Sequence, residues 1–289
     1  MTKALVLGST GMLGSAVTDE LMRHNIQVLE ASRTKGVRFD ATELMVEKLL
    51  DEAQLQQSDY IVNCVGLTKS RIDESDPGSR ANAVRLNFDF PNSLAKAAES
   101  RGIRILQVAT DCVYSGEKGS YLESDPHDPH DVYGKTKSLG EIPAANVMHL
   151  RCSLIGPELG RNSLFFEWVR QQPLDAKVAG YTNHHWNGLT SSAFGRIVAG
   201  IIKQNGFRAG VQHLVPEDKV TKDELVRMVL SSLKRDDVSV ESTKASHFVD
   251  RTLATERLEE NKALFENAGY SSLPTIGQMV QEMCSKLAN

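Results

Sequence analysis

Three side chains with complementary chemistry lie between residues 110 and 137 of this 289-residue chain. Thr110 directly follows Ile105–Ala109, an apolar run typical of a buried parallel strand. Tyr133 and Lys137 are four residues apart, so a helix would place them on one face, about one turn from each other. Because residues at the carboxyl ends of such strands face the ligand crevice of open α/β sheets, we expect a hydroxyl, a phenol and an ammonium in one site.

This combination suits the transfer of a hydride and a proton to a carbonyl group. A free phenol has a pKa of about 10 and is too weak an acid for fast proton exchange at neutral pH. We expect the Lys137 ammonium to favour the phenolate and so to lower the pKa of Tyr133. Tyr133 would then act as general acid while Thr110 holds the carbonyl oxygen. The Tyr-x-x-x-Lys spacing alone is more often a solvated helix face, so the prediction depends on the elements upstream.

A glycine-rich turn near the N-terminus predicts a dinucleotide site. Ala4–Leu7 has the pattern of a buried strand, and the Gly-x-x-Gly-x-x-Gly segment of residues 8–14 leads into an amphipathic run to Arg23. The first glycine permits the tight turn, the second lets the backbone approach a pyrophosphate, and the third lets the helix pack against the strand. The helix N-terminus adds free N–H groups. A simple glycine-rich turn is the alternative. The expected cofactor contacts are Gly8, Thr10, Gly11, Met12, Leu13 and Gly14.

The end of the second expected strand indicates which dinucleotide binds. Gln27–Ala31 is followed by Ser32 and Arg33. An NAD site usually carries an acidic residue here, which binds the ribose 2′-hydroxyl. A serine and an arginine suit a 2′-phosphate instead, so we predict NADP(H) rather than NAD(H). A surface arginine without a ligand is the alternative interpretation.

Three further segments add to the expected cofactor site and to the element pattern. Asp40 and Ala41 precede a helix that we expect Thr42 to cap and to run to about residue 53, and Asp40 would reach the adenine or assist the cap. The buried run of residues 60–66 would bring Val65 and Gly66 to the cofactor. The helix that follows, to about residue 101, contains a proline at position 91 that should kink or restart it.

Strands that alternate with helices predict an α/β fold, a Rossmann-type doubly wound parallel sheet with a smaller C-terminal substrate lobe. We assign residues 1–155 to an NADP-binding domain and residues 156–289 mainly to a substrate-binding lobe that partly folds back onto the sheet. In the second half we expect helices over residues 161–172 and 191–203, and a capping box from Thr221 to Glu224.

Composition excludes several classes of protein. Hydrophobic residues make up 40%, charged residues 24%, and the net charge is −4, which fits a globular protein and argues against nucleic-acid binding. No apolar run approaches a signal core or a membrane span, so a cytoplasmic protein without membrane contact is expected. The four cysteines form no C-x-x-C pair. His127 and His130 lie in a turn-rich loop, and we expect no metal site there. His184 and His185 are adjacent, so on a strand they would face opposite ways and could not bind one metal ion together.

The chain resembles the extended short-chain dehydrogenase/reductases, and within them the dTDP-4-dehydrorhamnose reductases and related nucleotide-sugar reductases. By that resemblance Thr110, Tyr133 and Lys137 are the catalytic residues, the cofactor is commonly NADPH, with Tyr133 and Lys137 also contacting it, and a homodimer is possible. The matching residues are Gly8–Gly14, Phe39, Asp40, Asn63–Gly66, Asn87, Thr110–Gly116, Glu123, Pro129, Tyr133–Lys137, Gly140, Glu141 and Leu150–Cys152.

The same resemblance implies where substrate binds and where this chain differs. Asp111 and Asn162 match substrate-side positions. Cys112 stands where the family usually has tyrosine, residues 182–190 follow the Asp-Gln-x-Gly-x-Pro-Thr pattern loosely, and the usual Arg-Pro near the C-terminus is absent. Within these divergent segments, Trp186 and Asn187 are candidates for stacking on a base or bonding a sugar hydroxyl, and Arg251 is a candidate substrate contact.

The function implied by the resemblance is NADPH-dependent reduction of a 4-keto-6-deoxy sugar nucleotide, with Tyr133 as general acid. A nucleotide-sugar epimerase or dehydratase is one alternative. Dehydratases usually carry two acids after the active-site threonine, whereas here Cys112 follows Asp111, and epimerases hold NAD tightly, which Arg33 argues against. The other alternative is a non-catalytic NADP-binding regulatory subunit that resembles the methionine adenosyltransferase β subunit. The nucleotide and the sugar stay open.

Overall fold

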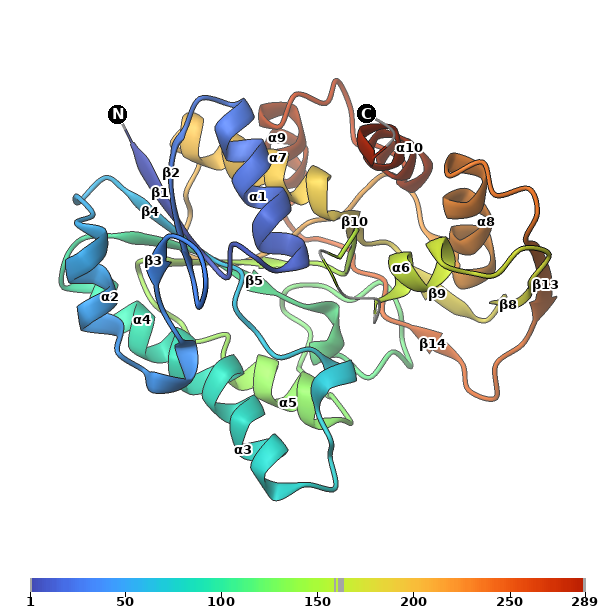
Figure 1. Ribbon diagram of the computed structural model, residues 1–289, viewed down its shortest axis with the longest axis horizontal. Helices are drawn as coiled ribbons and strands as arrows, with labels where there is room; N and C mark the ends of the chain where they lie inside the picture. The colour runs from blue at the N-terminus through green and yellow to red at the C-terminus, as the bar shows by residue number, and fades with distance from the viewer. Residues whose placement is uncertain (1, 159, 161–163, 288–289) are drawn as a thin grey trace.

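A seven-stranded parallel sheet forms the centre of the molecule (Figure 1). The computed structural model describes residues 2–158, 160 and 164–287, so the predicted substrate contact Asn162 lies outside the described residues. The strand order, β11-β6-β5-β4-β1-β2-β3, confirms the predicted Rossmann-type doubly wound sheet. The strands are β1 (Lys3–Leu7), β2 (Gln27–Ser32), β3 (Val37–Arg38), β4 (Tyr60–Asn63), β5 (Arg104–Ala109), β6 (Val147–Arg151) and β11 (Gly210–His213).

Helices cover both faces of this sheet (Figure 1). One layer contains α1 (Met12–Arg23), α7 (Ser191–Lys203), α9 (Leu258–Asn267) and α10 (Ile276–Leu287). The other layer contains α2 (Val46–Ala53), α3 (Pro77–Val84), the π-helical turn η3 (Arg85–Asp89), α4 (Phe90–Glu99) and α5 (Val132–Leu139).

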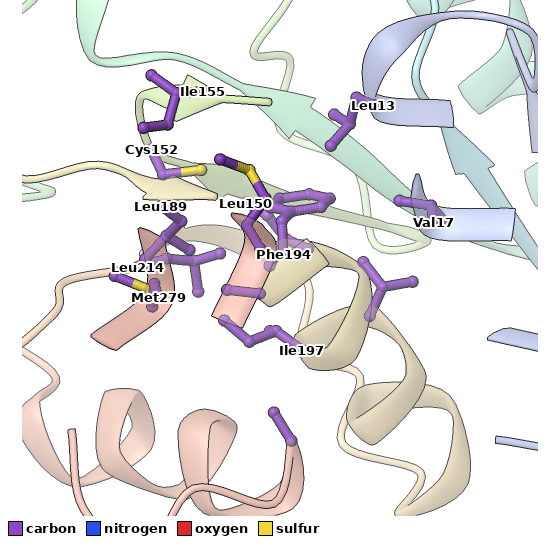
Figure 2. Packing of buried hydrophobic residues seen from close by; sticks show 14 of the residues in the cluster. Leu13, Val17, Leu150, Cys152, Ile155, Leu189, Phe194, Ile197, Leu214 and Met279 are labelled. Carbon is purple, nitrogen blue, oxygen red and sulfur yellow. The ribbon is translucent and has the colours of Figure 1, made fainter. Parts of the chain in front are cut away.

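Two apolar cores result, one on each face, because successive residues of a strand point to opposite sides. Within β1, Ala4 and Val6 join the core under α1 and α7, whereas Leu5 and Leu7 join the core under α2 and α4. Figure 2 shows the first core, in which side chains from α1, β6 and α7 gather: Leu13, Val17, Leu150, Phe194 and Ile197. The sheet is therefore held on both sides, and its carboxyl edge is fixed in space.

The second half of the chain contributes to both the sheet and a smaller lobe. β11 pairs with β6, and α7 packs on α1. The elements of the smaller lobe are α6 (Phe165–Arg170), β8 (Lys177–Tyr181), β9 (His184–Trp186), β12 (Val220–Thr221), α8 (Lys222–Ser232), β13 (Ser239–Thr243) and β14 (Val249–Asp250). The short strands β7 (Leu154–Ile155) and β10 (Leu189–Thr190) pair between the two regions. The predicted capping box at the start of α8 is confirmed.

The predicted cap at Thr42 is wrong. Asp40 caps a 3-10 turn, η1 (Ala41–Glu43), and its carboxylate accepts hydrogen bonds from the Thr42 backbone nitrogen at 2.9 Å and the Thr42 hydroxyl at 2.7 Å. Leu44 then adopts a left-handed conformation, and α2 begins only at Val46. Because the Asp40 carboxylate accepts hydrogen bonds from two donors, Asp40 takes the cap position in place of Thr42. The helix expected over residues 161–172 is described only as α6.

The predicted interruption near Pro91 is confirmed. The helical segment of residues 77–99 contains the π-helical turn η3 just before Pro91. A proline lacks a backbone N–H, and its ring clashes with the carbonyl four residues earlier, here that of Asn87. The Asn87 side chain donates to the Leu67 carbonyl and to the Thr136 hydroxyl, both at 3.1 Å, and accepts from the Leu67 nitrogen at 2.8 Å. These hydrogen bonds therefore tie the loop after β4 to α5.

Candidate active site

A continuous cleft runs past the carboxyl ends of β1, β4, β5 and β6. It consists of two adjoining cavities of about 500 and 300 Å³. The residues that line both cavities are Gly11, Met12, Cys64, Val65, Gly66, Leu67, Arg71 and Glu158. The first cavity continues to Gly8, Thr10, Ser32, Arg33, Asp40 and Ala41, and the second to Leu13, Thr110, Asp111, Tyr133 and Lys137. An elongated ligand placed along the cleft therefore reaches both ends.

The glycine turn forms a close backbone cradle in the middle of this cleft. Gly8 has a φ of +75°, and its nitrogen donates to the Ala31 carbonyl at 2.9 Å. A Cβ on Gly14 would lie 2.1 Å from the Gly8 carbonyl oxygen, so only glycine lets α1 begin this close to the turn. Gly11 precedes α1 without a side-chain cap, and the first turn of α1 carries no acidic residue. Its backbone N–H groups therefore fit a dinucleotide phosphate.

Ser32 and Arg33 have different roles at the first end of the cleft. The buried Ser32 hydroxyl accepts from the backbone nitrogens of Thr34 at 3.2 Å and Lys35 at 2.8 Å and donates to the Lys35 carbonyl, so it closes the turn after β2. Arg33 is exposed and has no carboxylate of the described residues within 4.0 Å. The arginine, rather than the serine, is thus the group that can bind an anion.

The candidate catalytic side chains meet in the second cavity. Tyr133 and Lys137 lie on α5, which Asp131 caps by accepting from the Gly134 nitrogen at 2.7 Å. Thr110 follows β5 in an extended conformation and accepts from the Cys112 nitrogen at 3.2 Å, capping the 3-10 turn η4 (Asp111–Val113). A Cβ on Gly134 would lie 2.2 Å from the Cys112 carbonyl, so this glycine permits close packing of α5 against η4. The catalytic roles of the three residues stay predictions.

The electrostatics of this cavity differ from the expected ones. Burial raises the pKa of the Tyr133 phenol above its usual range, and a side-chain hydrogen bond with Thr110 acts in the opposite direction. The Lys137 ammonium donates to the Val108 carbonyl at 2.8 Å, and burial lowers its pKa while the charge of Glu141 opposes that shift. The expected lowering of the Tyr133 pKa by Lys137 is therefore wrong for the free protein, because desolvation dominates. The phenol is neutral at neutral pH, which is the form that a general acid requires.

Two of the predicted substrate contacts lie close to this group. The buried Asp111 carboxylate accepts at one oxygen, Oδ1, from the Thr110 hydroxyl at 3.2 Å and from the Cys112 thiol at 3.6 Å. Burial raises the pKa of Asp111, and the charge of Arg251 acts in the opposite direction. Arg251 donates through Nε to the Tyr114 carbonyl at 2.9 Å. Asp111 therefore lines the second cavity and is influenced by the positive charge of Arg251.

Trp186 and Asn187, like Arg251, line neither cavity of the cleft. Trp186 is only 5% exposed and belongs to the apolar core. The Asn187 side chain donates to the Leu253 carbonyl at 2.7 Å and accepts from the Leu253 nitrogen at 2.9 Å. Asn187 thus joins two backbone segments. The substrate contacts of both residues stay predictions.

Several lining residues were not predicted from the sequence. Arg71, Glu158 and Cys64 line both cavities, and Cys112 and Cys152 line the second. Arg71 lies in the polar loop after β4, and the general rule that loops at the carboxyl edge bind ligands could have identified it. Nothing in the pattern around the cysteines distinguishes a cavity wall from a core position.

A buried polar cluster holds the C-terminal end of α5, the helix that carries Tyr133 and Lys137. Arg151 is 1% exposed and donates to the Tyr114 hydroxyl at 2.6 Å, to His213 Nε2 at 2.7 Å and to His127 Nε2 at 2.8 Å. Its guanidinium also pairs with Glu141, two residues beyond the end of α5. His127 in turn hydrogen-bonds the hydroxyl of Ser138, on α5, at 2.8 Å. The C-terminal end of α5 is therefore held by charge-assisted hydrogen bonds.

His213 should make this cluster sensitive to acid. Burial and the charge of Arg151, which donates to Nε2, lower the pKa of His213 from 6.5 to about 4, and the hydrogen bond between Nδ1 and the Ala254 carbonyl at 2.6 Å acts in the opposite direction. A lowered folded-state pKa means that the unfolded chain binds more protons than the folded chain between pH 6.5 and 4. The free energy of unfolding therefore decreases as the pH is lowered through that window. From pH 7 to pH 5 the loss from this group is about 2 kcal/mol. Denaturant unfolding should give a shallower pH dependence for His213→Gln; an equally steep one contradicts the assignment.

The histidines that suggested a metal have other partners. His130 contacts Glu117 at 3.3 Å, and His184 contacts the His247 carbonyl at 3.0 Å. Within the described ranges, no group of three or more His, Cys, Asp or Glu side chains is arranged to hold a metal ion. In the same part of the chain, no helix is long and apolar enough to cross a lipid bilayer.

A family model described as RmlD substrate binding domain matches residues 2–288. The chain belongs to this family. The RmlD-family chain is 34% identical to the dTDP-4-dehydrorhamnose reductase of Streptomyces griseus over 146 residues, 50% of this chain and 45% of that protein. It is 30% identical to the methionine adenosyltransferase 2 subunit beta of Bos taurus over 141 residues, 48% of this chain and 41% of that protein. The matched part thus spans less than half the length of these relatives.

A solved structure resembles this RmlD-family chain over its full extent. It is the dTDP-4-dehydrorhamnose reductase of Bacillus anthracis in complex with NADP, with a TM-score of 0.80 at 17% identity, covering 99% of this chain and 100% of that one. This likeness shows the fold alone. The predicted membership among reductase-like extended short-chain enzymes is confirmed by the family match.

Proposed function

We propose that the protein is an NADPH-dependent reductase of a 4-keto-6-deoxy sugar nucleotide. The observation that carries this proposal is the continuous cleft that leads from the glycine turn to a cavity lined by Thr110, Tyr133 and Lys137. The relatives named dTDP-4-dehydrorhamnose reductase and dTDP-4-keto-6-deoxy-D-glucose reductase support the substrate class.

NADP(H) is the proposed cofactor, and when bound it supplies the hydride. The backbone N–H groups at the start of α1 and the turn of Gly8 and Gly11 would hold its diphosphate. Arg33 would bind the 2′-phosphate through a charge-assisted hydrogen bond. Val65 and Gly66, which line both cavities, would form the wall between the two ends.

The chain's own residues would handle the proton. Tyr133 is neutral in the free protein and would donate its phenolic hydrogen to the keto oxygen of the sugar as the carbon becomes tetrahedral. The Thr110 hydroxyl, which contacts the phenol, would keep that oxygen in line. The Lys137 ammonium places a positive charge in the cavity, which stabilises the phenolate left after proton transfer.

The proposal also assigns one ligand to each half of the chain. Residues 1–155 would bind NADP(H), and residues 156–289 would mainly bind the sugar nucleotide. The pairing of β11 with β6 supports a substrate lobe that also contributes to the central sheet.

A turnover assay tests the proposal. NADPH oxidation should be measured with a panel of 4-keto-6-deoxy sugars on dTDP and on UDP, and at least one should be reduced at C4. Tight NADP binding without turnover of any of them would favour the regulatory-subunit alternative suggested by the methionine adenosyltransferase match. Tightly retained NAD with epimerised or dehydrated product would favour the epimerase or dehydratase alternative.

Arg33→Ala should lower the ratio of kcat/KM for NADPH to that for NADH about tenfold or more, because a charged hydrogen bond to the 2′-phosphate is lost. The same ratio measured for Arg38→Ala serves as control, since Arg38 is exposed on neighbouring β3 and lines neither cavity. An unchanged ratio for Arg33→Ala would remove this residue from the cofactor site.

A further inference from the structure

Arg151, the last residue of β6, uses every hydrogen-bond donor that it has. A guanidinium carries five N–H groups and no acceptor. In this buried site all five find a partner: Nε has one, and Nη1 and Nη2 have two each. The five acceptors are both carboxylate oxygens of Glu141, the Tyr114 hydroxyl, and the Nε2 atoms of His127 and His213. The guanidinium is therefore saturated, and each partner has a defined role.

This saturation fixes the protonation state of His127. Because an arginine only donates, His127 Nε2 accepts and carries no hydrogen, so the neutral ring is protonated at Nδ1. That Nδ1–H group donates to the Ser138 hydroxyl at 2.8 Å. A proton added at Nε2 would place two N–H groups face to face and a second positive charge beside Arg151. His127 therefore joins Arg151 to α5 only while it is neutral.

The charges around His127 favour this neutral form. Burial lowers the pKa of His127 below its ordinary value of 6.5, and the charge of Arg151 acts in the same direction. The charges of Glu141, 3.7 Å from Nε2, and of Asp128 act against that shift, but the Glu141 carboxylate is already paired with Arg151. The remaining titratable groups of the cluster are Tyr114, whose ring packs edge-on against His127, and His213.

The other end of this link lies beside the candidate catalytic lysine. Ser138 follows Lys137 directly in α5, a helix of eight residues whose first turn carries Tyr133. A helix this short is not stable on its own, so tertiary contacts set its position. The placement of both side chains relative to Thr110 therefore depends on such contacts, and the hydrogen bond from His127 is one of them.

We infer that His127 is a positioning residue for α5 and that its neutral form is required for turnover. His127 lines neither cavity of the cleft, so it acts through Ser138 and not on the substrate. Activity is then present above the folded-state pKa of His127 and is lost as the pH falls through it. The inference rests on the proposed function for the reaction that is measured.

Two variants at this position test the link at neutral pH. In His127→Gln the amide offers an acceptor to Arg151 and a donor to Ser138 but does not titrate, so kcat should stay within about twofold of the wild type. His127→Leu leaves both partners without a hydrogen bond and should lower kcat about tenfold, with the KM for NADPH unchanged. A full kcat in a folded His127→Leu protein would overturn the inference.

The pH dependence of kcat separates positioning from a merely structural role. Wild-type kcat should fall reversibly as the pH is lowered below 6.5, whereas His127→Gln should keep its activity about one pH unit further into acid. The control is His130→Gln, which removes an exposed histidine from the same loop and should follow the wild-type profile. Coincident profiles for the wild type and His127→Gln would contradict a role for the His127 proton.

NMR of the histidine ring nitrogens tests the inference without turnover. At neutral pH the His127 ring should carry its hydrogen on Nδ1, and its titration should shift the backbone amide signal of Ser138. A hydrogen on Nε2, or a Ser138 signal that does not follow the titration, overturns the inference even in an active reductase. The expected NMR result in a chain that reduces no 4-keto sugar keeps the link to α5 and overturns the reductase.

Discussion

Tyr133→Phe is expected to lower kcat for keto-sugar reduction about 100- to 10,000-fold, the range typical of losing a general acid. The phenol lies in the cavity that also contains Thr110 and Lys137, and burial keeps it protonated. Removing one oxygen leaves the ring to fill the same space. NADPH affinity and thermal stability should therefore stay close to those of the wild type, and steady-state kinetics with fluorescence titration of NADPH would measure both.

Tyr181→Phe is the matched control for this prediction. Tyr181 is 40% exposed on β8, far along the chain from α5, and its hydroxyl forms no hydrogen bond within the described residues. It should keep full activity. A Tyr133→Phe protein that binds NADPH and retains more than a tenth of the wild-type kcat would argue that another group donates the proton.

Gly14→Ala is expected to abolish dinucleotide binding and to destabilise the fold. The new Cβ would lie 2.1 Å from the Gly8 carbonyl oxygen and close to the Ser9 backbone, so α1 must move away from the turn. Overpacking of this kind costs about 1–3 kcal/mol. The displaced helix N-terminus would no longer present its N–H groups to the diphosphate. NADPH titration and denaturant unfolding would measure the two effects.

Gly206→Ala provides the comparison for that variant. A Cβ on Gly206 would meet only Ile201, at 3.7 Å, which is ordinary contact. This variant should bind NADPH normally and unfold within about 1 kcal/mol of the wild type. Normal NADPH affinity in Gly14→Ala would mean that the cofactor does not depend on the glycine turn.

The sheet and most of the cleft could be predicted from local sequence. Short apolar runs that end in glycine or in small polar residues mark parallel strands and the edge where ligands bind, and this rule located Gly8, Val65 and Thr110. The helical spacing of Tyr133 and Lys137 then placed both on one cavity wall. These features depend on residues near one another in the chain.

Features that arise only from tertiary packing could not be predicted in the same way. The direction of the Tyr133 pKa depends on how much water the folded cavity excludes, and sequence alone does not give that. Trp186 has the residue type of a ligand platform but packs into the core.

The most direct test of the central claim is to follow the transferred hydrogen. NADPH that carries deuterium on the reactive face of its nicotinamide ring should be incubated with the wild-type protein and a 4-keto-6-deoxy sugar nucleotide, and the product analysed by NMR. The proposed reaction places one deuterium at C4 of the sugar, and Tyr133→Phe should lose this labelling while still binding NADPH. A product without deuterium at C4, or no product with any nucleotide sugar tested, would contradict the assignment of this cleft as a reductase site.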